Sequence, residues 1–183
     1  MALSGCASFP ARTAKEPLPN FGKVNAQLYR GGQPTEAGLR QLAQMGIKTV
    51  VNLREENRSA LEGERHLTES LGMRWMHLPM RAYWKPSDRQ MRDFFKLTSD
   101  ASARPIFLHC RRGRDRAGVM VAAYHVVVEG WNPHAAYKDA LAHGMTRWNP
   151  LLRQVIFKAR SRYAQDFSPK PGRTSELTAV EGG

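Results

Sequence analysis

The residues best placed to do chemistry are Cys110 and Arg116, a cysteine and an arginine with five residues between them, in a stretch that begins with His109 directly after the apolar run 106–108. A loop of this length between the end of a strand and the start of a helix can curl so that successive backbone N–H groups point inward and bind an anion. The helix expected over 116–129 would direct the positive end of its dipole at the same point. The sequence therefore predicts a phosphate cradle over residues 110–116.

Cys110 is the predicted nucleophile of this cradle, and Arg116 is the predicted anion clamp. Backbone N–H groups, a helix terminus and nearby guanidinium groups all stabilise a thiolate, which is the nucleophilic form of cysteine. The planar guanidinium of Arg116 can hold two phosphoryl oxygens, and Gly113 lets the backbone approach the ligand closely. A small buried structural cysteine is the alternative, but it does not account for the strand, the glycine turn and the helix that surround Cys110.

This stretch resembles the His-Cys-x5-Arg signature of the cysteine-dependent phosphatases of the protein tyrosine phosphatase superfamily, and more narrowly the small bacterial dual-specificity-type enzymes. Three further stretches, 28–34, 46–54 and 130–133, share the resemblance in the order that the family shows. The resemblance implies a two-step hydrolysis of a phosphomonoester. Cys110 takes the phosphoryl group, an acid protonates the leaving oxygen, and water then cleaves the phosphocysteine.

The chain departs from the family pattern at Ala117, where the family usually has Ser or Thr after the arginine. That hydroxyl helps the thiolate leave, so its absence predicts slow turnover or a reliance on backbone donors. A phosphate-binding module that has lost turnover is therefore an alternative function. A rhodanese-like sulfur carrier is disfavoured, because its loop has four residues between the cysteine and the arginine.

Two carboxylates are candidates for the general acid. The family supplies an Asp from a mobile loop upstream of the cysteine, but residues 78–85 contain no carboxylate. Asp88 is the nearest candidate, and its distance from the cysteine resembles that in the plant and fungal atypical enzymes of this superfamily. A role as a helix cap or as a favourable charge in the first helical turn explains Asp88 equally well. Asp115 is the competitor, since myotubularin and Sac-type lipid phosphatases carry an Asp directly before the arginine. Its alternative role is an ion pair that shapes the loop, and either carboxyl must be protonated when it acts.

His109 is interpreted as a structural residue, because the resemblance implies that the residue before the cysteine is buried and orders the loop by hydrogen bonds. The other histidines show no spacing with carboxylates or cysteines that would build a metal site. We therefore expect neither a metal ion nor another cofactor.

The chain is strongly basic, with 28 Lys and Arg residues against 16 Asp and Glu residues and a formal net charge of +12. A basic surface favours an anionic partner or substrate. Arg111, Arg112 and Arg114 lie within the cradle itself, which favours a substrate with more negative charge than one phosphotyrosine, such as an inositol phosphate or a phosphoinositide head group. A phosphotyrosine protein is the other substrate class, and analogy with the similarly basic plant and fungal enzymes does not decide between them.

Nucleic acid and membranes are the rival partners for so basic a chain. We find no basic helix with interleaved aromatic residues, so no nucleic acid partner is expected. A basic adaptor for membranes or nucleic acid is the third hypothesis, and its binding would collapse with salt. No apolar run approaches the length needed to span a bilayer. The length suits one domain, which we expect to be a monomer.

The N-terminal stretch contains the other of the two cysteines, Cys6. Residues 3–6 resemble a bacterial lipobox, in which the cysteine becomes the lipidated N-terminus and tethers the protein in the cell envelope or periplasm. Residues 10–20 would then be a Pro-rich linker. The charged and apolar regions that should precede a lipobox are missing, so coincidence and a cytoplasmic protein stay open as alternatives.

The periodicity of apolar residues, with its helix caps and breakers, predicts an α/β fold. Strands are expected over 26–30, 47–53, 73–78 and 105–109, and helices over 35–45, 59–71, 87–99, 116–129, from 133, and 150–167. This order favours a central, mostly parallel sheet flanked by helices on both faces, with the phosphatase-type loop at the carboxyl ends of the strands. We expect a lipobox-like start and linker over 1–22, a phosphatase domain over 23–167 and a disordered tail over 168–183.

Overall fold

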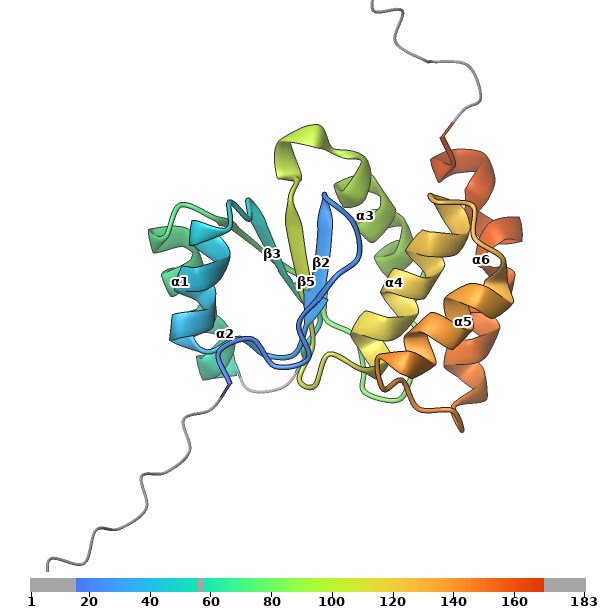
Figure 1. Cartoon of the computed structure of the whole chain (residues 1–183), viewed down its shortest axis with the longest axis horizontal. Helices are drawn as coiled ribbons and strands as arrows, with labels where there is room; N and C mark the ends of the chain where they lie inside the picture. The colour runs from blue at the N-terminus through green and yellow to red at the C-terminus, as the bar shows by residue number, and fades with distance from the viewer. Residues whose placement is uncertain (1–15, 56–57, 170–183) are drawn as a thin grey trace, which may run out of the picture.

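A single mostly parallel sheet lies at the centre of the computed structural model, which describes residues 16–55 and 58–169 (Figure 1). The strands follow the order β1-β2-β5-β3-β4, and only β1 runs antiparallel to its neighbour. Their bounds are Gly22–Lys23 for β1, Leu28–Gly31 for β2, Thr49–Asn52 for β3, Arg74–His77 for β4 and Ile106–His109 for β5.

Helices cover both faces of this sheet (Figure 1). One face carries α1 and α2, which span Glu36–Gln44 and Arg58–Ser70. The other face carries α3, Asp88–Ser99; α4, Asp115–Val127; α5, Pro133–Ala142; and α6, Pro150–Phe167. A short 3-10 turn, η1, occupies Ala101–Ala103 between α3 and β5. The predicted α/β architecture is confirmed.

The two elements that flank the cradle are almost entirely buried. All four residues of β5 are buried, and the strand pairs with β2 on one side and β3 on the other. Such a strand is covered on both faces, which explains its unbroken apolar run. In α4 every residue from Arg116 to Val127 is buried, because α5 and α6 pack over the side that faces away from the sheet. The cradle is therefore held between two rigid elements.

Local signals in the sequence mark most of the helix starts. Thr35 caps α1 by accepting a hydrogen bond from the backbone N–H of Gly38 at 3.1 Å. Ser87 and Gln90 form a capping box at the start of α3, and Asn132 caps α5 with proline at the first helical position. Each pattern satisfies backbone N–H groups that have no partner within the helix. The two-residue strand β1 has no comparable signal and is not among the predicted strands.

The domain begins earlier than the boundary predicted at residue 23. Leu18 is buried in an apolar cluster with residues of α1 and β3. The Pro17 carbonyl accepts a hydrogen bond from the N–H of Thr35 at 3.0 Å, and the Pro19 carbonyl accepts one from the N–H of Gly32 at 2.7 Å. Prolines often mark linkers because they have no backbone N–H to donate, but here their carbonyl groups accept hydrogen bonds from the folded domain. Residues 16–22 are therefore part of the domain and not of a linker.

The remaining predictions for the ends of the chain fall on residues that the structure does not describe. These are Cys6, most of the predicted linker and the tail from residue 170. Within 16–55 and 58–169, no helix is both long and apolar enough to cross a bilayer.

Replacing Leu18 by Ala tests the early start of the domain. Leu18 is 6% exposed, so the substitution should lower the free energy of unfolding by about 2–4 kcal/mol, through lost burial and a residual cavity. Urea unfolding measures this loss. Met45→Ala is the matched control, because Met45 is 41% exposed and its truncation should cost less than about 1 kcal/mol. Equal stability of Leu18→Ala and wild type would place residues 16–22 outside the cooperative fold.

Candidate active site

The predicted nucleophile and the predicted anion clamp lie at the same hollow, at the carboxyl end of β5. Cys110 is 3% exposed and Arg116 is 6% exposed. Both line a hollow of about 120 Å³, here called the cradle hollow. Its other walls are Ala82, Tyr83, Arg111, Arg112, Arg114 and Asp115. The structure therefore brings together the thiol, the buried guanidinium and the three exposed arginines that the sequence singled out.

The backbone of the cradle is free to receive an anion. Among the described residues, the N–H groups of residues 111–115 have no hydrogen-bond acceptor. A run of successive N–H groups without protein acceptors beside a hollow favours an anionic ligand. The start of α4 at Asp115 places the positive end of that helix at the same loop.

Gly113 allows the cradle to touch the end of β2. Its φ is +68°, a left-handed conformation that glycine adopts without strain. A Cβ atom at this position would lie 2.5 Å from the carbonyl carbon of Gly31 and 2.6 Å from the nitrogen of Gly32. The Gly113 carbonyl accepts hydrogen bonds from Nδ2 of Asn20 at 2.9 Å and from Nη2 of Arg30 at 2.5 Å. Only glycine fits this contact between two parts of the chain.

Arg30 is a buried cation behind the cradle that the sequence analysis did not identify. It is 1% exposed, and its Nε and Nη1 atoms have no hydrogen-bond partner among the described residues. Burial lowers the pKa of Arg30, while the charges of Asp139 and Cys110 act in the opposite direction. Burying a charged residue in a strand costs free energy, so a strand rarely contains one without a reason. An arginine within the otherwise apolar start of the stretch 28–34 was therefore the signal that could have identified Arg30.

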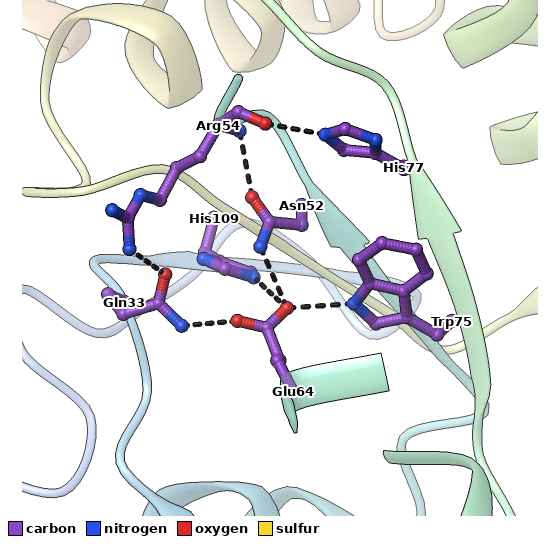
Figure 2. Close-up of polar contacts among 7 residues, drawn as sticks. All are labelled: Gln33, Asn52, Arg54, Glu64, Trp75, His77 and His109. Carbon is purple, nitrogen blue, oxygen red and sulfur yellow. Dashed lines mark hydrogen bonds and ion pairs between the residues drawn. The ribbon is translucent and has the colours of Figure 1, made fainter. Parts of the chain in front are cut away.

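A second buried charge, Glu64 of α2, holds the histidine that precedes the nucleophile (Figure 2). His109 is fully buried, and its Nε2 lies 3.1 Å from Oε1 of Glu64. The same oxygen accepts hydrogen bonds from Nδ2 of Asn52 at 2.9 Å and from Nε1 of Trp75 at 2.8 Å. The amide of Gln33 donates to the other carboxylate oxygen. Donors from β3 and β4, and the ring of the last residue of β5, thus meet at one carboxylate beside the cradle.

This network extends toward the surface through Arg54. Nη1 of Arg54 donates to the side-chain oxygen of Gln33 at 2.7 Å, and its backbone N–H donates to Oδ1 of Asn52 at 2.8 Å. The ring of His77 contacts the Arg54 carbonyl at 2.6 Å (Figure 2). Glu64 was not singled out from the sequence, because α2 has the charge density of a surface helix and one buried carboxylate gives no local signal.

The two candidate acids lie in different places. Asp115 lines the cradle hollow, and its Oδ1 accepts a hydrogen bond from the backbone N–H of Thr146 at 2.7 Å. Asp88 does not line that hollow. It is the first residue of α3 and faces α6, where Oδ1 accepts a hydrogen bond from the Tyr163 hydroxyl at 2.6 Å and Oδ2 pairs with Arg162 at 3.0 Å. Burial and then this hydrogen bond raise the pKa of Tyr163 to about 12.

The loop after β4 forms one wall of the cradle hollow. Nη1 of Arg116 donates a hydrogen bond to the Met80 carbonyl at 3.1 Å, which fixes the guanidinium against this loop. Tyr83 has a φ of +61° and an exposed ring that lines the hollow. Nδ2 of Asn149 donates to the Tyr83 carbonyl at 3.0 Å and secures the unusual conformation from the start of α6.

Across the part of the chain that the structure describes, no group of three or more His, Cys, Asp or Glu side chains could hold a metal ion.

Acid should weaken the fold through Glu64. Burial raises the pKa of Glu64, but His109, Trp75 and Gln33 outweigh burial and hold the pKa at about 2, below its usual 4.5. Its carboxylate thus stabilises the fold above pH 4.5, and this contribution disappears as the pH falls from 4.5 to about 2. We expect Glu64→Gln to lose roughly 3 kcal/mol of unfolding free energy at pH 7.

Urea unfolding of both proteins between pH 7 and pH 2.5 measures this effect. The difference between wild type and Glu64→Gln should narrow steadily below about pH 4.5. A difference that stays constant over this range would contradict a carboxylate held ionised by its partners.

Adding one methyl group at Gly113 should disrupt the cradle. Gly113→Ala forces a Cβ atom into the backbone of Gly31 and Gly32 and strains a positive φ. We expect at least a tenfold loss of inorganic phosphate affinity, because the loop must move and its N–H groups no longer converge. Calorimetric titration with inorganic phosphate measures the loss.

Gly63→Ala is the matched control for this substitution. Gly63 lies in α2, and a Cβ atom there meets nothing within 4 Å. The control should bind phosphate as wild type does and gain about 0.5–1 kcal/mol of stability from helix propensity. Unchanged phosphate affinity in Gly113→Ala would show that the close contact does not shape the cradle.

Comparison with known proteins places these observations in a family. The family model described as a DSP-PTPase phosphatase fused to NAD+ kinase matches residues 11–150. The probable chloroplastic NAD kinase 2 of Oryza sativa is 35% identical over 161 residues, which cover 84% of this chain and 15% of the rice protein. The dual specificity protein phosphatase TpbA of Pseudomonas aeruginosa is 27% identical over 131 residues, covering 72% of this chain and 57% of TpbA. The chain thus spans only part of these relatives.

Solved structures show the same fold. The crystal structure of P. aeruginosa TpbA superposes with a TM-score of 0.65 at 23% identity, covering 81% of this chain and 92% of TpbA. The core catalytic domain of the PP-IP phosphatase SIW14 from S. cerevisiae superposes with a TM-score of 0.72 at 16% identity, covering 83% and 92%. The family match covers most of the chain, and the solved structures agree with it in fold. The chain therefore belongs to the dual-specificity-type phosphatase domains described as fused to NAD+ kinase, within the cysteine-based phosphatase superfamily.

Proposed function

We propose that this chain hydrolyses phosphomonoesters through a phosphocysteine intermediate, with Cys110 as the nucleophile, Arg116 as the anion clamp and Asp115 as the general acid. The observation that carries the proposal is the cradle hollow, where a buried thiol and a buried guanidinium lie beside unpaired backbone N–H groups. Family membership supports phosphatase function in general.

The first chemical step transfers the phosphoryl group to sulfur. The Cys110 thiolate attacks phosphorus, the bond from phosphorus to the ester oxygen breaks, and Asp115 gives its proton to the departing oxygen. Arg116 and the N–H groups of residues 111–115 bind the equatorial oxygens, where charge spreads in the transition state. Asp115 is preferred to Asp88 because it lines the cradle hollow, whereas Asp88 is engaged by Arg162 and Tyr163.

The second step returns the enzyme to its starting state. Asp115, now a carboxylate, takes a proton from water, whose oxygen attacks phosphorus while the bond from phosphorus to sulfur breaks. The products are inorganic phosphate and the Cys110 thiolate. Ala117 offers no hydroxyl to the departing thiolate, so its stabilisation falls to the backbone N–H groups of the cradle, the start of α4 and the nearby guanidinium groups. We therefore expect this step to limit the rate.

The proposed substrates are phosphotyrosine proteins or highly anionic molecules such as inositol phosphates and phosphoinositide head groups. Three exposed arginines around the hollow support the second class. The relatives include proteins of both kinds, since TpbA is named a dual specificity protein phosphatase and an Arabidopsis thaliana relative, 25% identical over 137 residues, is named inositol diphosphatase DSP3.

A second candidate function is phosphate binding without turnover. The specific observation that favours it is the missing hydroxyl at position 117, next to the clamp. Such a module would accumulate phosphocysteine or bind phosphorylated ligands without releasing phosphate.

Substitutions at the nucleophile and at the two carboxylates test this mechanism. Cys110→Ser should abolish phosphate release from p-nitrophenyl phosphate and keep inorganic phosphate binding, because only the attacking atom changes. With an alkyl phosphate, whose leaving group is poor, Asp115→Asn should slow phosphocysteine formation about a hundredfold to ten thousandfold. Single-turnover kinetics measure this step apart from hydrolysis.

Asp88→Asn serves as the comparison in the same assay and should form phosphocysteine at the wild-type rate. The opposite pattern would move the acid role to Asp88, and two unchanged rates would exclude both carboxylates. Binding of phosphate by a wild-type protein that releases none from any of the proposed substrates would favour the binding module over the enzyme.

A further inference from the structure

The three exposed arginines of the cradle line two hollows. Besides the cradle hollow, they line a second hollow of about 510 Å³. Its remaining walls come from the segment before β1, the segment after β2 and the end of α5, and they are Pro19, Asn20, Gln33, Ala142, His143 and Gly144. Neither Cys110 nor Arg116 lines it. A group bound there would lie beside the reacting atoms and not at them.

The positive charge between the two hollows is not neutralised by the protein. Among the described residues, the side chains of Arg111, Arg112 and Arg114 form no hydrogen bond or ion pair with another side chain, and no acidic residue lines the second hollow. Some arginines elsewhere on the surface are paired with carboxylates, as in Arg65–Glu62, Arg92–Asp166 and Arg162–Asp88. Unpaired guanidinium groups that share two concave surfaces favour an anion in each.

The second hollow is shaped by fixed parts of the chain. Nδ2 of Asn20 donates hydrogen bonds to the carbonyl of Gly113 at 2.9 Å and to that of His143 at 3.2 Å, which ties the cradle to the end of α5. Gly144 has a φ of +86°, and a Cβ atom there would lie 3.1 Å from Nε of Arg114. Arg114 therefore lies against a residue without a side chain, and any larger residue at position 144 would crowd it.

We infer that the second hollow binds a second phosphate group of the same substrate, an inference that rests on the proposed phosphatase function. One phosphate lies in the cradle hollow at Cys110, and the arginines between the hollows contact both phosphates. The substrate class that satisfies both hollows is a small molecule with phosphate groups at two or more separate positions. A substrate with one phosphate leaves the second hollow unused.

Ala142 offers a charge test that leaves the cradle itself unchanged. It is exposed at the last position of α5 and lines only the second hollow. In a Cys110→Ser background, calorimetry compares binding of inositol trisphosphate and inositol monophosphate. Ala142→Glu should weaken the trisphosphate about fivefold and Ala142→Lys should strengthen it by a similar factor, as one unit charge near a phosphate in a solvated site would. The monophosphate should change by less than about twofold.

Ala101→Glu and Ala101→Lys are the matched controls. Ala101 is exposed in η1, at the opposite end of β5 from the cradle, and its substitutions change the net charge equally. Equal shifts at positions 101 and 142, equal shifts for the two ligands, or no shift at position 142 would each overturn the second phosphate site.

The outcome for the second hollow is separate from that of the proposed function. Wild-type hydrolysis of p-nitrophenyl phosphate together with an unchanged trisphosphate affinity in Ala142→Glu would overturn the second site alone. Absence of hydrolysis with every substrate tested, together with no phosphate binding by Cys110→Ser, would overturn both.

Discussion

The contact between Gly113 and the end of β2 is the constraint on which the site depends. Glycines on both sides let the cradle backbone approach the chain at Gly31 and Gly32 more closely than any side chain would allow. This approach places the Gly113 carbonyl within reach of Asn20 and Arg30, two donors from different segments. These donors satisfy the carbonyl and hold it against β2, so the N–H groups of the loop are left for an anion.

Two opposite charges, Glu64 and Arg30, are buried beside this loop, and they differ in how many hydrogen-bond partners surround them. Glu64 is surrounded by donors that keep it ionised, so its desolvation is offset by several hydrogen bonds. Arg30 has one partner for its side chain among the described residues, the Gly113 carbonyl, and two nitrogens without any. Its charge, which Asp139 offsets only in part, lies near Cys110 and contributes to the positive potential of the cradle. The carboxylate thus fixes the histidine that precedes the cradle, whereas the guanidinium places positive charge behind it.

Much of the fold could be predicted from the sequence, because strands and helices depend on local patterns. Apolar runs marked β3 and β5, and caps such as Ser87 marked helix starts within a residue. The cradle was found in the same way, since its cysteine, glycine and arginine lie in one short loop. The site residues that were missed, Arg30 and Glu64, act only through contacts across the sheet, which no local pattern records. Residues 16–22 were assigned to the linker for a related reason. Their prolines accept hydrogen bonds from residues that are distant in sequence, and no local pattern records these bonds.

The choice between the two carboxylates shows what tertiary contacts add to a spacing argument. In sequence, both carboxylates were candidates for the acid, Asp88 by its distance upstream of Cys110 and Asp115 by its position directly before Arg116. In the structure, the capping box at Ser87 fixes Asp88 to the first turn of α3, where α6 supplies its partners. Asp115 is the first residue of α4, the helix that directly follows the cradle loop, and its carboxyl therefore lines the cradle hollow. The helix that directs its dipole at the phosphate therefore also supplies the proposed proton donor, and one element performs both tasks.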